Sequence, residues 1–406
     1  MQFIHWGIAF IGHVGLWCAT FNYLHSTALV RWARKSSEIF VLLFLVFPVF
    51  FGLWQLIGWI IGGNTPLTLI GDNIAGNAYS VVTSVVAVPT IILWVVRKLS
   101  PKRPASVVEF STHQEKVEST TGTPLLHGTT SQLLGALPKN ETLTLAVDRL
   151  TVMLNVPPAL NGLKIAHLSD FHLTGRVDRQ FFEHVVARAN SFEPDLVVLS
   201  GDLVDKVKCL DWIDSIFGAL KSKYGCYYVL GNHDARVGDV EDLCRRLKAA
   251  GLTHLGGVWR TVEINGVSIQ IAGNELPWFS GAEFLPLSAD AQTQEPTSEP
   301  DTRAGMKILI SHSPDQLKWA KPFEFDLMFA GHNHGGQISF PIVGPIIAPS
   351  RYGVRYAAGT FQIGKMLMHV SRGVSAEKPI RWNSVPELGL FTIQTPEDTP
   401  QNLPIR

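Results

Sequence analysis

Five segments between residues 163 and 336 each contain a short apolar run that is followed within a few residues by aspartate, asparagine or histidine. Stretches of helical spacing follow the first three, at residues 179–192, 210–223 and 240–251. Apolar runs of about five residues that alternate with helices are typical of buried parallel strands. We therefore predict an α/β fold, layered in the α+β manner. The segments are LKIAHLSDFHL, DLVVLSGDLVD, GCYYVLGNHDA, MKILISHSPD and FDLMFAGHNHGG.

The polar residues at these strand ends predict a metal site. Because the carboxyl ends of strands in such sheets line one crevice, residues far apart in the chain are expected to meet there. Imidazoles mixed with carboxylates and an amide suit manganese, iron or zinc, whereas an all-oxygen set favours calcium or magnesium. So many ligands are too many for one ion, and they fit two ions about 3.5 to 4 Å apart that share a carboxylate. The candidates are Asp170, His172, Asp202, Asn232, His233, His312, His332 and His334.

The series of motifs resembles that of the calcineurin-like metallophosphoesterase family. SDFH, GDLVD, GNHD, SHSPD and GHNHGG follow one another in order, and the resemblance covers residues 145–394. It implies a sandwich of β-sheets flanked by helices, and hydrolysis of a phosphoric ester or pyrophosphate with two divalent ions, of which manganese is favoured. GHNHGGQ, SRG and PIRWNSVPELGLFTI are most similar to the membrane-anchored branch. Some relatives in that branch hydrolyse the pyrophosphate of UDP-2,3-diacylglucosamine.

The resemblance also implies a role for each candidate. Asp202 bridges the two ions. His233 binds no metal and lies over the phosphate, where it stabilises or protonates the leaving oxygen. The remaining ligands are Asp170, His172 and His334 for the first ion, and Asn232, His312 and His332 for the second.

Four neighbouring residues are assigned supporting roles. Asp234 is expected to orient His233 through a hydrogen bond. Asp205 is expected to cap a turn or support the site rather than bind metal. Gln337 and Arg351 are candidates for contact with substrate.

Three segments near the N-terminus are apolar enough to cross a bilayer, which takes about 20 residues. They are residues 3–21, 39–61 and 78–96. Basic residues, which favour the cytoplasmic side, lie between the first two segments and after the third. We therefore predict a multi-pass protein of the cell inner or cytoplasmic membrane, with the N-terminus outside and the catalytic domain in the cytoplasm.

The composition divides the rest of the chain. Residues 100–144 are rich in Ser, Thr, Pro and Gly and are predicted to form a flexible linker. The predicted domains are thus a membrane region at 1–99 with three transmembrane helices, this linker, and a metallophosphoesterase domain at 145–406.

Three functions remain open at this stage. The first is hydrolysis of a lipid-linked substrate such as UDP-2,3-diacylglucosamine, with the bilayer as partner. The second is a phosphodiesterase or phosphatase for soluble nucleotides or phosphoproteins, and the third is a non-enzymatic membrane scaffold that binds metal. The formal net charge is zero and no dense basic run lies near the motifs, so a nucleic-acid partner is not expected. The oligomeric state is left open.

Overall fold

The computed structural model describes residues 2–27, 31–60, 74–100, 103–279 and 305–396. The chain divides into two compact units. The helical unit contains residues 1–101 and 346–355, and the sheet unit contains residues 102–345 and 356–406.

Three long helices make up most of the helical unit: α1 (Gln2–His25), α2 (Arg31–Ile60) and α4 (Ile74–Leu99). Two stretches, Ile4–His25 and Ala78–Leu99, are long and apolar enough to cross a membrane. They correspond to the first and third predicted spans. Helix α2 covers the second predicted span up to residue 60, but the side chains of residues 48–60 lie outside the described part, so this span stays a prediction.

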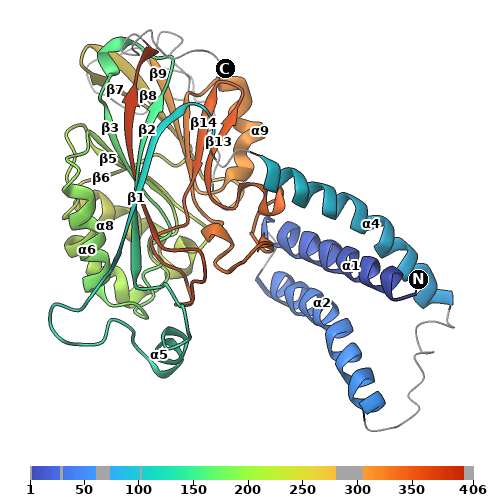
Figure 1. Cartoon of the computed structure of the whole chain (residues 1–406). Coiled ribbons are helices and arrows are strands. Elements are labelled where there is room, and N and C mark those ends of the chain that lie inside the picture. Colours follow the sequence, from blue (N-terminus) through green and yellow to red (C-terminus); the bar gives the residue numbers. More distant parts are fainter. Residues whose placement is uncertain (1, 28–30, 61–73, 101–102, 280–304, 397–406) are drawn as a thin grey trace. The chain divides into compact units, whose positions relative to one another are not determined.

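A seven-stranded mixed sheet forms the first layer of the sheet unit, in the order β1-β2-β15-β3-β4-β5-β6 (Figure 1). Strands β3 to β6 are parallel, as the alternation of strands and helices predicts. Strand β15 connects them to β2, because it pairs antiparallel with β3 and parallel with β2. The strands are β1 (Val107–Lys116), β2 (Thr144–Met153), β3 (Lys164–Leu168), β4 (Leu196–Ser200), β5 (Cys226–Val229), β6 (Leu252–His254) and β15 (Glu387–Gln394).

A six-stranded sheet forms the second layer, in the order β13-β14-β10-β9-β8-β7. Its centre, β14 to β8, is parallel, and β13 and β7 pair antiparallel at the two edges. The strands are β7 (Trp259–Ile264), β8 (Val267–Asn274), β9 (Met306–Ser311), β10 (Leu327–Ala330), β13 (Gly359–Ile363) and β14 (Met366–Val370). A small hairpin of β11 (Ser339–Phe340) and β12 (Gly344–Pro345) lies outside both sheets.

The two faces of the first sheet are buried against different partners. Because side chains alternate along a strand, Ala166 and Leu168 of β3 face a core shared with helices, whereas Ile165 faces a core shared with the second sheet. Helices α6 and α8 lie on the outer side of the first sheet (Figure 1). The sandwich of sheets flanked by helices agrees with the predicted fold class. The helices of this unit are α5 (Thr129–Gly135), α6 (Arg179–Asn190), α7 (Ile213–Ile216), α8 (Val240–Ala249) and α9 (Leu317–Ala320).

The structure differs from the prediction of a flexible linker at residues 100–144. Residues 107–116 form β1, which pairs with β2 along nearly its whole length, and residues 129–135 form α5. Both elements belong to the sheet unit, which starts at residue 102 rather than 145. The strand escapes sequence analysis because it lies at the edge of the sheet with most side chains exposed on both faces. It therefore lacks the apolar alternation that identifies a half-buried strand.

Candidate metal centre

Turns at the ends of five strands carry the predicted ligands. Strands β3, β4 and β5 of the first sheet and β9 and β10 of the second are each followed within four residues by one or two of them. The structure brings most of these residues into two groups, in each of which one ligand atom per residue lies within 4.8 Å of the others. The first group is Asp170, His172 and His334, and the second is Asp202, His312 and His332.

The first group has the donor spacing of a metal site. His172 Nε2 lies 3.1 Å from His334 Nε2. Asp170 Oδ1 lies 3.8 Å from the former nitrogen and 3.4 Å from the latter. Ligand atoms bound to one ion at about 2.1 Å are separated by about 3.0 to 3.4 Å in octahedral or tetrahedral geometry. Two of the three separations lie in this range and the third is 3.8 Å, so the three side chains converge as ligands of one transition-metal ion would.

Asp202 lies between the two groups. Its Oδ2 atom is 3.5 Å from His172 Nε2 and 3.3 Å from His312 Nε2. His312 Nε2 in turn lies 3.2 Å from Asn232 Oδ1 and 3.1 Å from His332 Nδ1. The amide oxygen of Asn232 thus joins the second group, and one carboxylate faces both groups. This is the arrangement that two ions sharing a bridging ligand require.

Two of the ligand histidines have fixed tautomers. His172 Nδ1 donates to Asp205 Oδ1 at 2.9 Å, and His312 Nδ1 donates to the backbone oxygen of Ser200 at 2.7 Å. In a neutral ring the opposite nitrogen then carries the lone pair, and in both residues that atom faces the ligand group. Such outer partners orient metal-binding histidines and raise their basicity.

The backbone at the centre is strained. Left-handed φ angles in residues other than glycine cost about 1 kcal/mol or more each, and they cluster at functional sites where the surroundings enforce them. Five of the seven predicted metal ligands adopt such angles. They are Asp170, His172, Asp202, His332 and His334, with φ between 46° and 71°. The sharp turns swing successive side chains toward one point.

Two glycines allow the backbone to approach the ligand carboxylates. A Cβ atom on Gly331 would lie 2.3 Å from Asp170 Oδ2, and one on Gly231 would lie 2.2 Å from Asp202 Oδ1. Neither carboxylate is free to move without leaving its ligand group. The glycines of GHNHGG and GNHD thus serve close packing at these two positions.

His233 lies beside the metal ligands and is held by a carboxylate. Its Nδ1 atom donates to Asp205 Oδ2 at 2.7 Å, and its ring lies 4.5 Å from that of His172. The Nε2 atom accepts from Arg236 at 2.9 Å, and Arg236 also pairs with Glu377 at 3.0 Å. The side chain of His233 is 14% exposed, so it is placed to meet a substrate.

The carboxylate that His233 contacts is Asp205, which corrects the role predicted for Asp234. Both carboxylate oxygens of Asp234 accept backbone N–H groups, from Leu203 and Val204 through Oδ1 and from Gly231 through Oδ2, each at 2.8 Å. Asp234 therefore ties the turns after β4 and β5 together.

The two predicted substrate contacts lie in different places. Gln337 directly follows the GHNHGG turn, and its side chain donates to the backbone oxygen of Lys378 at 3.0 Å. Arg351 is exposed and belongs to the helical unit. Contact of either residue with substrate stays a prediction.

Buried arginines and histidines that sequence analysis missed support the centre. Arg381 is fully buried and donates to the backbone oxygens of His334 and Arg372. Nothing in the pattern around it indicates burial, since an isolated arginine between Ile380 and Trp382 is normally exposed.

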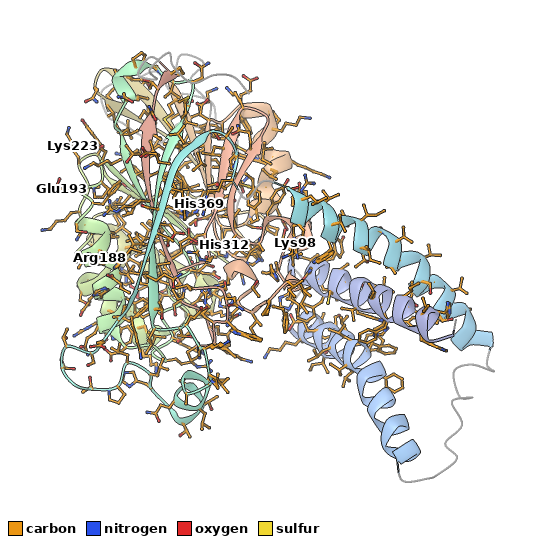
Figure 2. The ribbon with its side chains drawn as sticks, viewed as in Figure 1. Lys98, Arg188, Glu193, Lys223, His312 and His369 are labelled. Atoms are coloured by element: carbon orange, nitrogen blue, oxygen red, sulfur yellow. The ribbon has the colours of Figure 1, made fainter. Side chains whose placement is uncertain are left out.

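A second buried chain of hydrogen bonds starts beneath the second ligand group. Ser200 Oγ contacts His167 Nε2 at 2.8 Å, and His167 Nδ1 contacts His369 Nδ1 at 2.8 Å. His369 Nε2 then contacts Glu387 Oε1 at 3.0 Å. His312, whose Nδ1 contacts the Ser200 backbone oxygen, and Glu387 are thus the two ends of one buried path, on which His369 also lies; His312 and His369 are labelled in Figure 2.

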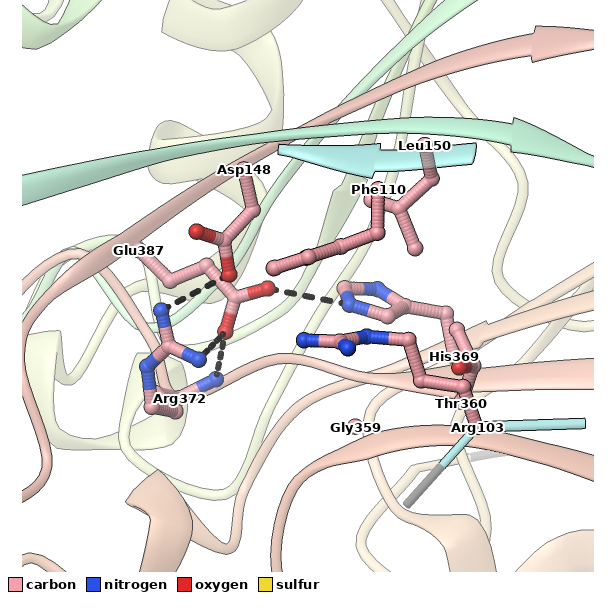
Figure 3. A pocket seen from close by; sticks show the side chains of 9 residues that line it. All are labelled: Arg103, Phe110, Asp148, Leu150, Gly359, Thr360, His369, Arg372 and Glu387. Carbon is pink, nitrogen blue, oxygen red and sulfur yellow. Dashed lines mark hydrogen bonds and ion pairs between the residues drawn. The ribbon is translucent and has the colours of Figure 1, made fainter. Parts of the chain in front are cut away.

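That path ends at a small cavity between β1, β2 and β13. The cavity has a volume of about 90 Å³ and is lined by Asp148, Arg372, Glu387 and His369, with Arg103 at its side (Figure 3). Arg372 joins the two carboxylates, through NH2 to Asp148 at 2.9 Å and through its backbone N–H to Glu387 at 2.9 Å. The charged residues that line the cavity therefore form a cluster with a structural role.

The charges of the centre compensate one another in the metal-free form. Burial opposes protonation of His172, but Asp205 and the other nearby carboxylates raise its pKa to about 9. The pKa of His312 is also about 9, because Asp202 outweighs burial. Burial and Arg381 hold the pKa of His334 well below its ordinary value. A mixed set of imidazoles, carboxylates and one amide in this charge balance fits divalent transition metals.

Comparison with known proteins finds relatives that are named as phosphoesterases or as a pyrophosphatase. The model of the calcineurin-like phosphoesterase family matches residues 163–336. An uncharacterized metallophosphoesterase of Aquifex aeolicus is 33% identical over 265 residues, covering 64% of this chain and 97% of that protein. A transmembrane protein with metallophosphoesterase domain of Danio rerio is 33% identical over 195 residues, covering 46% of this chain and 43% of that protein. The UDP-2,3-diacylglucosamine pyrophosphatase LpxG of Chlamydia muridarum is 24% identical over 280 residues, covering 56% of this chain and 83% of that protein.

Proposed function

The chain belongs to the calcineurin-like phosphoesterase family and is a metal-dependent phosphoester hydrolase, and we propose that it acts on a lipid-linked phosphoester or pyrophosphate such as UDP-2,3-diacylglucosamine. The observation that carries this substrate class is the presence, in one chain, of the ligand groups and of helices long enough to cross a bilayer. Such helices keep the enzyme where lipid headgroups are abundant. The pyrophosphatase LpxG, a relative with that substrate in its name, adds support.

The proposed chemistry uses the residues around the ligand groups. Two divalent ions, when bound, supply Lewis-acid polarisation of the phosphoryl group and activation of water. Asp170, His172 and His334 would hold one ion, and Asn232, His312 and His332 the other, with Asp202 shared. Manganese is our proposal for both, since the donor set mixes hard oxygens with imidazole nitrogens.

His233 is the proposed catalytic residue. Asp205 fixes its Nδ1 proton, so Nε2 is the atom that faces substrate. We assign to Nε2 the contact with the leaving oxygen. The imidazolium form of His233, with a proton on each nitrogen, gives its Nε2 proton to that oxygen as the phosphorus–oxygen bond breaks, and the neutral ring that remains keeps its Nδ1 proton on Asp205. In the structure Nε2 accepts from Arg236, so the guanidinium must move aside when the leaving group arrives.

We further propose a multi-pass protein with a cytoplasmic catalytic domain. The support is the distribution of basic residues, with Arg31, Arg34 and Lys35 after the first span and Arg97 and Lys98 at the end of the last. The bilayer is the proposed partner, and no nucleic acid is expected.

The test is a substrate panel with the purified full chain in nanodiscs and manganese. Release of UMP from UDP-2,3-diacylglucosamine, faster than hydrolysis of soluble nucleotides and phosphopeptides at equal concentration, is the expected result. Hydrolysis confined to the water-soluble substrates would contradict the lipid-linked substrate and leave the soluble phosphodiesterase or phosphatase.

A further inference from the structure

The hairpin of β11 and β12 exposes apolar side chains at its tip. Ile342 is 77% exposed, and among the described large hydrophobic residues outside α1, α2 and α4 it is the most exposed. Phe340 and Val343, at 40% and 44%, lie beside it in sequence. Exposed apolar groups of this kind mark interaction surfaces when they are contiguous.

The conformation of the tip holds these groups outward. Ile342 has a φ of 67°, and a β-branched residue in this region is an outlier that the surroundings must enforce. The backbone N–H of Val343 donates to the oxygen of Pro341 at 2.7 Å, which closes the turn around Ile342. A folded chain that strains its backbone to expose an isoleucine points to a use for that side chain outside the sheet unit.

The base of the hairpin is joined to the metal centre. Ser339 N–H donates to the oxygen of Trp382 at 2.8 Å, and the Phe340 ring lies 5.7 Å from that of Trp382. Two residues before Ser339, the Gln337 N–H donates to the oxygen of the candidate ligand His334 at 2.9 Å. The hairpin is therefore fixed to the turn that carries a metal ligand.

The other end of the hairpin continues into the helical unit. Residues 346–355 follow β12 directly and belong to that unit. Asn22, near the end of the candidate span Ile4–His25, accepts from Ala348 N–H at 2.9 Å and donates to the oxygen of Ile346 at 3.4 Å. The chain thus passes from the hairpin to the end of a candidate membrane helix within three residues.

The sequence of this passage suits the boundary between lipid headgroups and acyl chains. Residues 338–350 contain no charged side chain, and Arg351 follows them. Aromatic and aliphatic groups next to basic residues are typical of segments that lie in the membrane interface. A soluble partner protein gives no reason for the tip to be joined to the end of a candidate membrane helix.

We propose that the hairpin tip, residues 340–343, inserts into the bilayer interface and contacts acyl chains beside the metal centre. This inference rests on the membrane attachment in the proposed function and specifies which element meets the lipid. It places the lipid contact six to nine residues along the chain from His334.

The first test measures lipid contact directly. The full chain in nanodiscs is labelled with an environment-sensitive fluorophore on Ile342→Cys, with Cys244→Ser to remove the half-buried native thiol. Lipids brominated on their acyl chains should quench this label. The matched label on Leu133→Cys, a residue of α5 that is 68% exposed, should not be quenched. Equal quenching at both positions, or none at position 342, would overturn the proposal. The proposal would also be overturned if, in lipid-free detergent, the label became more shielded as the protein concentration rises. That result would show that the tip contacts a second copy of the chain.

The second test separates this inference from the proposed function. The ratio of activity on UDP-2,3-diacylglucosamine in vesicles to activity on bis-p-nitrophenyl phosphate should fall by about tenfold or more in Phe340→Ser/Ile342→Ser, since two apolar side chains lose their burial. The control Leu133→Ser/Leu137→Ser, with similar exposure, should keep the ratio. An unchanged ratio in the hairpin variant contradicts the inference. If the label at position 342 is quenched but the unlabelled wild-type enzyme cleaves no lipid-linked substrate, the proposed substrate is refuted and the lipid contact stands.

Discussion

His233 Nδ1 and Asp205 Oδ2 lie 2.7 Å apart, while the other oxygen of the same carboxylate lies 2.9 Å from Nδ1 of the ligand His172. One buried aspartate therefore orients both the proposed proton donor and a metal ligand. Both histidines stabilise its charge, so although burial opposes ionisation, the pKa of Asp205 lies well below its ordinary value. The site is built around this shared carboxylate.

The first prediction concerns this carboxylate. Asp205→Asn should lower kcat by about 10²-fold or more, because His233 loses the partner that selects its tautomer. Manganese affinity should also fall, by about 10- to 100-fold, because the neutral amide of the variant orients His172 less firmly than the charged carboxylate does. Steady-state kinetics at saturating manganese and a metal titration measure the two effects separately. Asp211→Asn, a substitution at an 84% exposed aspartate, should change neither quantity.

The second prediction separates catalysis from metal binding. His233→Ala should retain its metal and lose turnover by about 10²-fold or more on substrates with poor leaving groups. The loss should be smaller for p-nitrophenyl esters, because that leaving group departs without a proton donor. Equal turnover of wild type and variant on an alkyl ester would refute the assignment.

Arg236 provides a third prediction. Its guanidinium pairs with Glu377 and contacts the nitrogen that His233 needs for the leaving group, so it must move as substrate binds, toward the incoming phosphate. Arg236→Ala should raise KM by about 10- to 100-fold, the effect of losing a hydrogen bond to a charged group, with a smaller change in kcat. Arg245→Ala, a substitution at a 73% exposed arginine, is the control. A fall in kcat at constant KM would instead place Arg236 among the groups that act in the chemical step.

The fourth prediction concerns the charge cluster around the cavity in Figure 3. Burial opposes the charge of Glu387, but Arg372 and His369 hold its pKa well below the ordinary value. A depressed folded-state pKa gives stability that is present above the ordinary pKa of about 4.3 and is lost as pH falls. Glu387→Gln should therefore lower the free energy of unfolding at pH 7 by about 3 kcal/mol or more.

The pH dependence checks the cause of that loss. The difference between wild type and Glu387→Gln should shrink below about pH 4 as the wild-type carboxylate loses its advantage. Denaturant unfolding of the full chain in detergent, followed by tryptophan fluorescence, measures it. Glu193→Gln, a change at an exposed glutamate, should show no such difference. A constant difference across pH would show that packing, rather than charge, stabilises the cluster.

Sequence alone identifies the strands and the polar residues that meet at their ends because both leave strong local signals. Buried parallel strands are continuous apolar runs, and ligand side chains interrupt them at their ends, as Asp170 and His312 do. The polar edge strand β1 gives no such signal and was missed. An edge strand needs a pairing partner to be identified, and that partner is β2 in the folded chain.

The fine structure of the site depends on backbone direction that sequence does not reveal. Asp234 adjoins His233 in sequence, yet Asp205, 28 positions away, supplies the hydrogen bond. The left-handed angles at Asp170 and His172 decide where those side chains point, although neither is a glycine that would announce such a turn. Arg381 is buried only because backbone oxygens of two segments, one at His334 and the other at Arg372 and Ser375, surround its guanidinium.

The central claim is that Asp202 is shared by two ions held by strand-end turns of both sheets. Anomalous diffraction from crystals of the full chain grown with manganese tests it directly. We predict two peaks about 3.5 to 4 Å apart, on either side of Asp202 Oδ2, one beside His172 and His334 and the other beside His312 and His332. A single peak, or peaks distant from Asp202, would contradict the account.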